Sequence, residues 1–281
     1  MIHIITDTTA CLPLETARRY DIPVIPQIIT LSDKSYYEGV EIDIETFMRL
    51  LESKADPPKT AAPPPELFVQ EFTRLASSGN PILCIHPSAE VSGTVRSATV
   101  AARDFPELDI RILDTRLVAS PLGTLVQLAA EWAAEGLEID AVLARLHDYM
   151  ARARIYFMVE TLEFLARGGR IGGAAHLLGS MLRIKPILTL NDGKVEPYER
   201  ERTHKRAVAR LKEIVSEQAP HNGKAYCSVL HAGAPLAGKA LAAELQMLIN
   251  QPYIPVFDMP PAIVTHGGPG ILGAAFFRAA P

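Results

Sequence analysis

The sequence is poor in cysteine and in long apolar stretches, and each shortage excludes a class of protein. Its three cysteines, Cys11, Cys84 and Cys227, lie far apart without a C-x-x-C pair in 281 residues. That pattern disfavours a disulfide framework or a zinc site and fits a reducing cytoplasm. The most apolar long window, residues 117–132, is interrupted by Ser, Pro, Gly, Gln and Glu, so we expect no transmembrane helix. Residues 2–5 are already strand-like, so we expect no signal peptide.

The chain also lacks a strong net charge and the usual phosphate-binding and hydrolase motifs. Its formal net charge is −4, so it has no electrostatic footprint for nucleic acid. It contains no G-x-x-x-x-G-K-[ST] motif, so we expect no ATP site of its own. It also contains no G-x-S-x-G nucleophile elbow. Hydrophobic residues make up 48% and charged residues 21%, as in folded proteins with a sizeable core, and the length suggests two domains.

Predicted strands and helices alternate as far as residue 152, and the pattern then changes. The alternation predicts a largely parallel sheet with helices on both faces. The second part contains a hairpin turn at Asn191-Asp192-Gly193 and is α+β in character. We therefore predict an α/β protein with domains 1–152 and 153–281. The predicted strands are 2–6, 24–31, 82–86, 111–115, 155–159, 187–190, 194–196, 225–231, 253–257 and 262–265. The predicted helices are 14–20, 43–53, 66–77, 95–103, 121–134, 140–151, 161–167, 174–184, 203–218 and 235–249.

Several hydroxyl residues lie between a predicted strand, 82–86, and the start of a predicted helix, 95–103. The segment Ser88 to Ala98 carries hydroxyls at positions 88, 92, 94 and 97 and a glycine, Gly93. Free backbone N–H groups and the positive end of a helix dipole at such a point favour an anionic ligand. In open α/β sheets, ligands bind beyond the carboxyl ends of the strands. The simpler alternative is that Ser92 or Thr94 only caps the helix.

Two further segments have the residue types of a ligand site. The proline-rich loop 56–65 can hold Thr60 in a set position because proline fixes φ, although a plain linker is equally compatible. His266, followed by several glycines, can titrate near neutrality and donate to a head group. Its alternative role is to cap the end of the predicted strand 262–265. Gly168 is predicted to end the preceding helix as a left-handed cap.

Several separated motifs together resemble the DegV family of bacterial fatty-acid-binding proteins. The most specific is Thr161-Leu162-Glu163-Phe164-Leu165-Ala166-Arg167-Gly168-Gly169-Arg170-Ile171. The others, which cover the chain in family-like order, are residues 5–13, 91–98, 114–116, 185–188, 202–203 and 266–273. The resemblance implies two α/β domains with an acyl chain bound between and into them.

The resemblance also implies roles for particular residues. Thr60, Ser92, Gly93 and His266 would meet the ligand's carboxyl group. The family's proline loop usually continues after threonine with another hydroxyl residue and glutamine, whereas this chain has Ala61-Ala62. The candidates for lining the acyl chain, each of which could instead be ordinary core, are Phe164, Leu165, Leu177, Leu178, Met181 and Leu182. Arg170 and Arg202 would contact a partner. A solvated helix face is the simpler interpretation of the basic cluster around Arg202, which consists of Arg200, Arg202, His204, Lys205, Arg206 and Arg210.

These implications predict a binding protein rather than an enzyme. The chain would bind a long-chain fatty acid and present its carboxyl group to a separate ATP-dependent fatty-acid kinase subunit, which would form an acyl phosphate. We expect no catalytic residue, metal or cofactor in the chain itself, no nucleic-acid partner and at most transient peripheral membrane contact. Two alternatives remain open: a serine-dependent lipid ester hydrolase using Ser92 and His266, and a regulator that binds a lipid or another metabolite.

Overall fold

The computed structural model describes residues 2–53, 57–180, 184–223 and 225–280. The chain forms two compact units, Met1–Asp43 with Lys54–Ala151, and Ile44–Ser53 with Arg152–Pro281. The division differs from the predicted boundary at residue 152 in one main respect. Helix α2 (Ile44–Ser53) precedes that boundary but belongs to the second unit. Within that unit, the methyl group of Met48 lies 2.7 Å from where a Cβ on Gly233 would be. The apolar stripe of α2 predicts a helix but does not reveal which core it joins.

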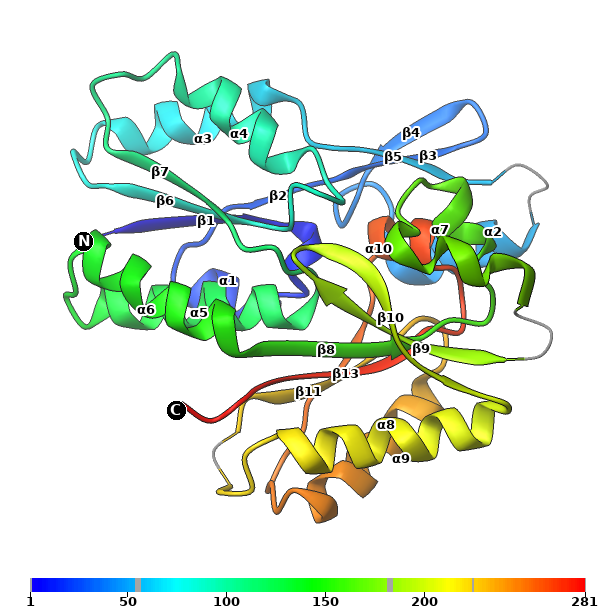
Figure 1. Cartoon of the computed structure of the whole chain (residues 1–281). Coiled ribbons are helices and arrows are strands. Elements are labelled where there is room, and N and C mark those ends of the chain that lie inside the picture. The colour runs from blue at the N-terminus through cyan, green and yellow to red at the C-terminus, as the bar shows by residue number, and fades with distance from the viewer. Residues whose placement is uncertain (1, 54–56, 181–183, 224, 281) are drawn as a thin grey trace. The chain divides into compact units, whose positions relative to one another are not determined.

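The first unit contains a four-stranded parallel sheet (Figure 1). All five residues of its strand at 82–86 are buried, as expected for a parallel strand covered on both faces. The parallel register places the carboxyl ends of neighbouring strands at one edge of the sheet. In spatial order the strands are β2 (Val24–Ile25), β1 (His3–Asp7), β6 (Ile82–His86) and β7 (Ile110–Asp114).

Helices cover both faces of this sheet, as predicted (Figure 1). Helices α3 (Pro65–Ala76) and α4 (Thr94–Ala102) lie on one face, and α5 (Ser120–Ala134) and α6 (Ile139–Arg152) on the other. Phe68 and Phe72 of α3 pack in a buried cluster with Ile5 and Ile82 of the sheet. The short helices η1 (Thr8–Ala10) and α1 (Leu14–Arg19) follow β1.

A small antiparallel sheet in the first unit corrects two predictions. Its strands, in spatial order, are β4 (Lys34–Tyr37), β3 (Ile28–Leu31) and β5 (Lys59–Ala61). The single strand predicted over 24–31 is two strands, because Pro26 cannot donate to a ladder and interrupts the pairing. The proline-rich segment predicted as a loop contains β5, in which Thr60 pairs with Ile29.

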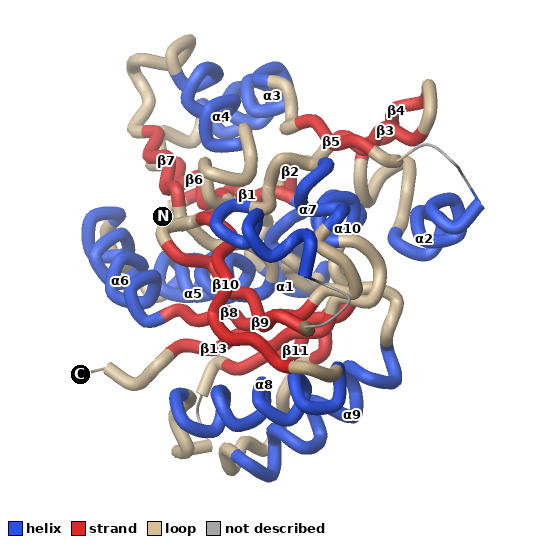
Figure 2. The backbone as a smooth tube through the Cα atoms, turned by 45° about the vertical axis from the view of Figure 1, so that its right-hand side comes forward, coloured by secondary structure: helices blue, strands red, loops and turns tan. Residues whose placement is uncertain are grey.

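The second unit contains a six-stranded mixed sheet (Figure 2). All neighbouring strands are antiparallel except the last pair. The predicted hairpin is confirmed, with positive φ at Asp192 and Gly193. In spatial order the strands are β10 (Lys194–Glu201), β9 (Lys185–Asn191), β8 (Ala153–Met158), β13 (Leu272–Phe277), β11 (Cys227–His231) and β12 (Val256–Asp258).

Two long helices, α8 (His204–Gln218) and α9 (Pro235–Leu248), cover one face of this sheet (Figure 2). Leu211 of α8 and Leu245 of α9 share a buried core with Ile187, Val229 and Phe276 of the strands. The predicted start of α8 is confirmed, since Thr203 Oγ1 accepts a hydrogen bond from Arg206 N at 3.3 Å. The shorter helices of this unit are α2, α7 (Glu163–Arg167), η2 (Gly172–Ser180) and α10 (Pro261–Gly267).

Three predictions in the second unit are wrong. Residues 262–265, predicted as a strand, lie in α10, which begins with Pro260 as N-cap and Pro261 in its first turn, where proline favours a helix start. Gly168 keeps a right-handed backbone, and Gly169 has the positive φ instead. The helix predicted over 174–184 is a 3₁₀ helix over 172–180, and residues 181–183 lie outside the described part of the chain.

Helix length and hydropathy also bear on membranes. Among the residues that the structure describes, no helix is both long and apolar enough to cross a bilayer.

Candidate functional site

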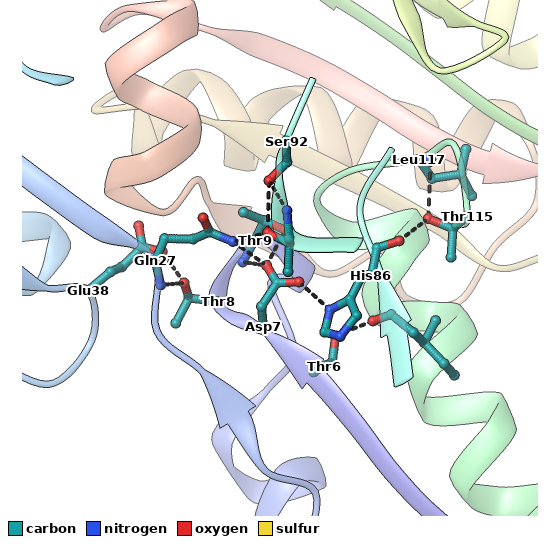
Figure 3. Close-up of polar contacts among 12 residues, drawn as sticks. Thr6, Asp7, Thr8, Thr9, Gln27, Glu38, His86, Ser92, Thr115 and Leu117 are labelled. Atoms are coloured by element: carbon teal, nitrogen blue, oxygen red, sulfur yellow. Dashed lines mark hydrogen bonds and ion pairs between the residues drawn. The ribbon is translucent and has the colours of Figure 1, made fainter. Parts of the chain in front are cut away.

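A buried aspartate–histidine pair lies at the carboxyl edge of the parallel sheet in the first unit (Figure 3). Asp7 ends β1 and His86 ends β6, and the parallel register brings the two ends together. His86 Nδ1 lies 2.8 Å from Asp7 Oδ2, and neither side chain is exposed. The His86 ring also packs edge-on against Phe68, with 5.3 Å between ring centroids. The pair is therefore a fixed part of the core.

The carboxylate of Asp7 is saturated with donors. Its Oδ1 accepts hydrogen bonds from Thr9 N at 3.0 Å, Thr9 Oγ1 at 2.6 Å and Gln27 Nε2 at 3.0 Å. Gln27 reaches Asp7 because it follows β2, which pairs with the last residues of β1. These donors offset the cost of burying a carboxylate.

Hydrogen bonds continue from Asp7 to the serine predicted to bind the ligand (Figure 3). Gln27 Nε2 donates to Thr94 Oγ1 at 2.9 Å, and Thr94 Oγ1 lies 2.8 Å from Ser92 Oγ. Thr94 N also lies 3.3 Å from Ser92 Oγ. Gly93 is the N-cap residue of α4 and makes no side-chain capping bond. Ser92 is half-buried, whereas Thr94 is fully buried.

The loop between β6 and α4 is anchored to the end of β7. Asp114 Oδ1 accepts hydrogen bonds from Ala89 N at 3.2 Å and Arg116 N at 2.9 Å. Ser88 N donates to Leu117 O at 2.9 Å. The motif at 114–116 therefore holds the start of the loop that carries Ser92.

The structure brings the segment of Thr60 next to the same loop. A Cβ on Gly93 would lie 3.2 Å from the Cβ of Ala62, one residue beyond β5. The strand pairing of Thr60 with Ile29 sets its position, and its side chain is half-buried. Thr60, Ser92 and Gly93 therefore belong to one region of the first unit.

His266 belongs to the second unit, where two predicted motifs meet. It lies in α10, and its ring occupies the space where a Cβ on Gly168 would be. Phe164 of α7 packs in the same way against Gly268, 2.6 Å from the position of a Cβ there. The motif at 161–171 and the C-terminal glycine motif thus form one packed cluster, in which glycine at 168 and 268 permits the close approach.

The charge state of His266 differs from the prediction. Burial, with a smaller contribution from the positive charge of Arg170, lowers the pKa of His266 to about 4. Arg170 is itself held close by, since its Nη1 donates to Gly168 O at 2.6 Å. The imidazole is therefore neutral at pH 7 and does not titrate near neutrality, because the predicted value ignored burial.

The predicted acyl-chain residues differ in their burial. Leu165 and Leu177 are buried and Phe164 is half-buried. Leu178 is 42% exposed, so η2 is not buried on every side. Met181 and Leu182 lie outside the described residues.

The two predicted docking arginines also occupy different surroundings. Arg170 is half-buried beside His266, whereas Arg202 is exposed between β10 and α8. Within the basic cluster around Arg202, Arg210 is bound by Glu199, Glu213 and Glu217. The positive charge of the cluster therefore centres on the residues before and at the start of α8.

Other candidate chemistry finds no support. Burial raises the pKa of the Cys84 thiol strongly and that of Cys227 to about 12, so neither is a ready nucleophile. In the described ranges of the chain, no three His, Cys, Asp or Glu side chains converge on a metal site. Residues 268–273 have the spacing G-x-G-x-x-G, but they follow a helix and lead into β13. A dinucleotide-binding loop has the opposite order.

Comparison with known proteins identifies the family of the chain. A family described as "Uncharacterised protein, DegV family" matches residues 1–279. A DegV domain-containing protein of Streptomyces coelicolor is 39% identical over 274 residues, covering 97% of this chain and 96% of that protein. The chain therefore belongs to the DegV family.

Solved structures of the family share the fold. A DegV family protein from Thermus thermophilus, whose structure is described as showing fatty-acid binding, has a TM-score of 0.89 and 32% identity and covers 99% of both chains. DegV of Bacillus subtilis, described as a fatty-acid-binding protein, has a TM-score of 0.88 and 29% identity, also with 99% of both chains covered. The predicted family and fold class are confirmed.

Proposed function

We propose that this chain binds a long-chain fatty acid and presents its carboxyl group to a separate ATP-dependent fatty-acid kinase subunit. The observation that carries the proposal is the placement of Ser92 and Gly93. They lie at the carboxyl edge of a parallel sheet, in a chain matched over 99% of its length by fatty-acid-binding proteins. This edge is where α/β sheets bind ligands.

The head-group site would be built from neutral donors. A carboxylate that leaves water needs donors, or its transfer costs several kcal/mol. The hydroxyls of Thr60 and Ser92 and the N–H of Gly93 are donors of the first unit, and a ring N–H of His266 would be supplied by the second. Because the pKa of His266 is lowered to about 4, it would act at pH 7 as a neutral hydrogen-bond donor.

The acyl tail would provide most of the binding free energy. Burying roughly 15 methylene groups at about 0.8 kcal/mol each yields on the order of 12 kcal/mol before ordering costs are subtracted. Leu165 and Leu177 are the described apolar candidates already withdrawn from water, and Phe164, which is half-buried, lies in α7 with Leu165. Met181 and Leu182 stay candidates for the same lining.

Within its own unit, the surroundings of Ser92 fit a carrier, because Ser92 Oγ bonds to no described basic group there. A nucleophilic serine needs a base that takes its proton. Among the described residues of the first unit, Ser92 Oγ bonds only to the hydroxyl and N–H of Thr94. Phosphoryl transfer also needs Mg²⁺ and triphosphate to be held, and a partner would supply both. Brief contact with a membrane surface, where free fatty acids gather, is compatible with this role.

Lipid binding is tested by mass spectrometry of the denatured protein and by thermal shift with a C16 or C18 fatty acid. We expect a fatty acid to co-purify from a bacterial host and added lipid to raise the melting temperature. Ser92→Ala should weaken binding about 10- to 150-fold, because a hydrogen bond to a charged group contributes about 1.5–3 kcal/mol. Ser97→Ala, at a half-buried position of the same segment, is the control. Absence of both lipid and stabilisation would contradict the proposal.

The kinase role is tested by acyl phosphate formation from ATP with the kinase alone, this chain alone and both together. We expect product only from the mixture. Arg202→Ala, and to a lesser extent Arg170→Ala, should impair phosphorylation while sparing lipid binding, since their proposed role is contact with the partner. Lys239→Ala, an exposed change on α9, is the control. Product from this chain alone, or equal product with and without it, would contradict this step.

A further inference from the structure

A series of hydrogen bonds runs from Asp7 through Gln27 and Thr94 to Ser92. The donor and the acceptor of each bond can be assigned as far as Thr94. The carboxylate of Asp7 only accepts, so the side-chain nitrogen of Gln27, and not its oxygen, must face it. The same nitrogen lies 2.9 Å from Thr94 Oγ1 and can only donate. The Thr94 hydroxyl oxygen is therefore an acceptor toward Gln27.

The proton of the Thr94 hydroxyl then has one destination. The Thr94 side chain is completely buried, and in the described part of the first unit its hydroxyl has only Gln27 and Ser92 Oγ as partners. If Ser92 donated to Thr94, the Thr94 proton would be buried without an acceptor, which is costly. Thr94 therefore donates to Ser92 across the 2.8 Å contact.

This direction determines what Ser92 can offer a ligand. Its oxygen accepts from the Thr94 hydroxyl and from Thr94 N at 3.3 Å, which occupies both of its lone pairs. Its own proton has no acceptor among the described residues of its unit, and the side chain is only half-buried. Ser92 is therefore left with a proton to donate and no oxygen lone pair with which to accept.

We infer that Asp7, Gln27 and Thr94 are positioning residues that make Ser92 a donor-only group, and that they thereby select a carboxylate over head groups that also donate, such as a primary alcohol. The inference rests on the proposed function, since it concerns the ligand of the same site. The series of hydrogen bonds begins at Asp7, whose other carboxylate oxygen, Oδ2, lies 2.8 Å from His86 Nδ1. Successive donors in such a chain polarise one another toward the ligand.

The test is a selectivity ratio, because a merely structural defect would weaken every ligand alike. Lipid-free protein is titrated with a sixteen-carbon fatty acid and with the primary alcohol of the same length, by displacement of a fluorescent fatty-acid analogue. Thr94→Val keeps the shape and the backbone N–H but removes the hydroxyl, so that Ser92 can also accept. We expect the preference for the acid to fall about tenfold, mainly through weaker acid binding.

Two further variants sharpen the result. Gln27→Met interrupts the same chain one residue earlier and should lower the ratio in the same direction. Thr99→Val is the matched control, because Thr99 lies on α4 but donates to Val95 O at 2.7 Å, outside the chain, and its ratio should equal that of the unmodified protein.

The outcomes separate this inference from the proposed function. If the unmodified protein binds the acid but Thr94→Val and Gln27→Met leave the ratio unchanged, this inference is overturned and the proposed function stands. If the unmodified protein binds neither ligand, the proposed function fails and this inference fails with it.

Discussion

His266 is a buried histidine whose surroundings lower its pKa well below the ordinary value. Its ring packs against Gly168 and faces the charge of Arg170, and its pKa falls to about 4 from an ordinary value of 6.5. The unfolded chain therefore binds more protons than the folded one between these two values. The free energy of unfolding consequently falls as the pH is lowered from about 6.5 toward 4.

We predict that replacing His266 removes much of this pH dependence. Between pH 7 and pH 5, His266 should account for a loss of up to about 2 kcal/mol in the free energy of unfolding. The measurement is urea unfolding of lipid-free protein at both pH values, for the unmodified protein and for His266→Gln. His221→Gln, at an exposed position of the same unit, should keep the full pH dependence. An equal pH dependence in His266→Gln would show that the folded state does not exclude the charged imidazole.

The residue-level chemistry of the site was only partly predictable. Ser92, Gly93 and Thr60 stand out in the sequence because hydroxyl residues and glycine follow a strand or sit among prolines. Gln27 and Thr94 do not, because they are 67 positions apart. Their contact depends on the pairing of β2 with β1, which places Gln27 beside Asp7. A signal was available for Asp7, which directly follows the predicted strand 2–6, but polar residues are common after strands.

At the scale of elements, the first turn of α5 supports the segment that carries Asp7 and Thr9. Ala119 N donates to Thr9 O at 2.9 Å, and a Cβ on Gly123 would overlap the carbonyl oxygen of Ala10. Ala119 itself has φ 60 and ψ −145, a conformation that only glycine adopts without strain. This helix end is therefore close-packed and strained at once.

We predict opposite effects for two exchanges of glycine and alanine at this helix end. Gly123→Ala should lower the free energy of unfolding by about 1–3 kcal/mol, because the added methyl pushes η1 away. Ala119→Gly should raise it by up to about 1 kcal/mol by relieving backbone strain. Both can be followed by the fluorescence of Trp132, the chain's single tryptophan, which lies in α5 itself. If Gly123→Ala left the free energy of unfolding unchanged, η1 and α5 would not be as closely packed as the structure shows.

Element prediction succeeded where local pattern and burial agree. Strand β6 was predicted with its observed bounds, because four apolar residues and His86 lie between two prolines. Helix α10 was misassigned because Ile263, Val264 and Thr265 favour strands, while its packing against α7 and α2 favours the helix. Strand β13 was not predicted, since its Gly273-Ala274-Ala275 segment lacks the β-branched residues that mark a strand.

At the scale of the whole molecule, the second unit is discontinuous in sequence. Its helix α2 comes from residues 44–53, about a hundred positions before the rest of the unit begins. Phe47 of this helix is completely buried, and Met48 contacts Gly233. A continuous C-terminal piece of the chain therefore lacks part of its own unit.

We predict that the fragment 152–281 is markedly less stable than the same residues in the intact chain. Losing a buried phenylalanine and its neighbours should cost at least about 3 kcal/mol. The measurement is urea unfolding followed by circular dichroism, with dye binding as a report of exposed apolar surface. Phe47→Ala in the intact chain should reproduce part of the loss. A fragment as stable as the intact protein, with no dye binding, would contradict the role assigned to α2.

Because the second unit is discontinuous, α2 is synthesised long before the rest of that unit. Helix α2 emerges early from the ribosome. Strand β13, which lies inside the six-stranded sheet of the same unit, is synthesised last. At about 5–20 residues per second, some 220 residues separate the two events by roughly 10–45 seconds. Throughout that interval the apolar face of α2, with Phe47 at its middle, has no finished core to enter. A nascent chain of this protein thus carries an uncovered hydrophobic helix near its N-terminus for most of its translation, and that helix is the place where a chaperone would be needed first.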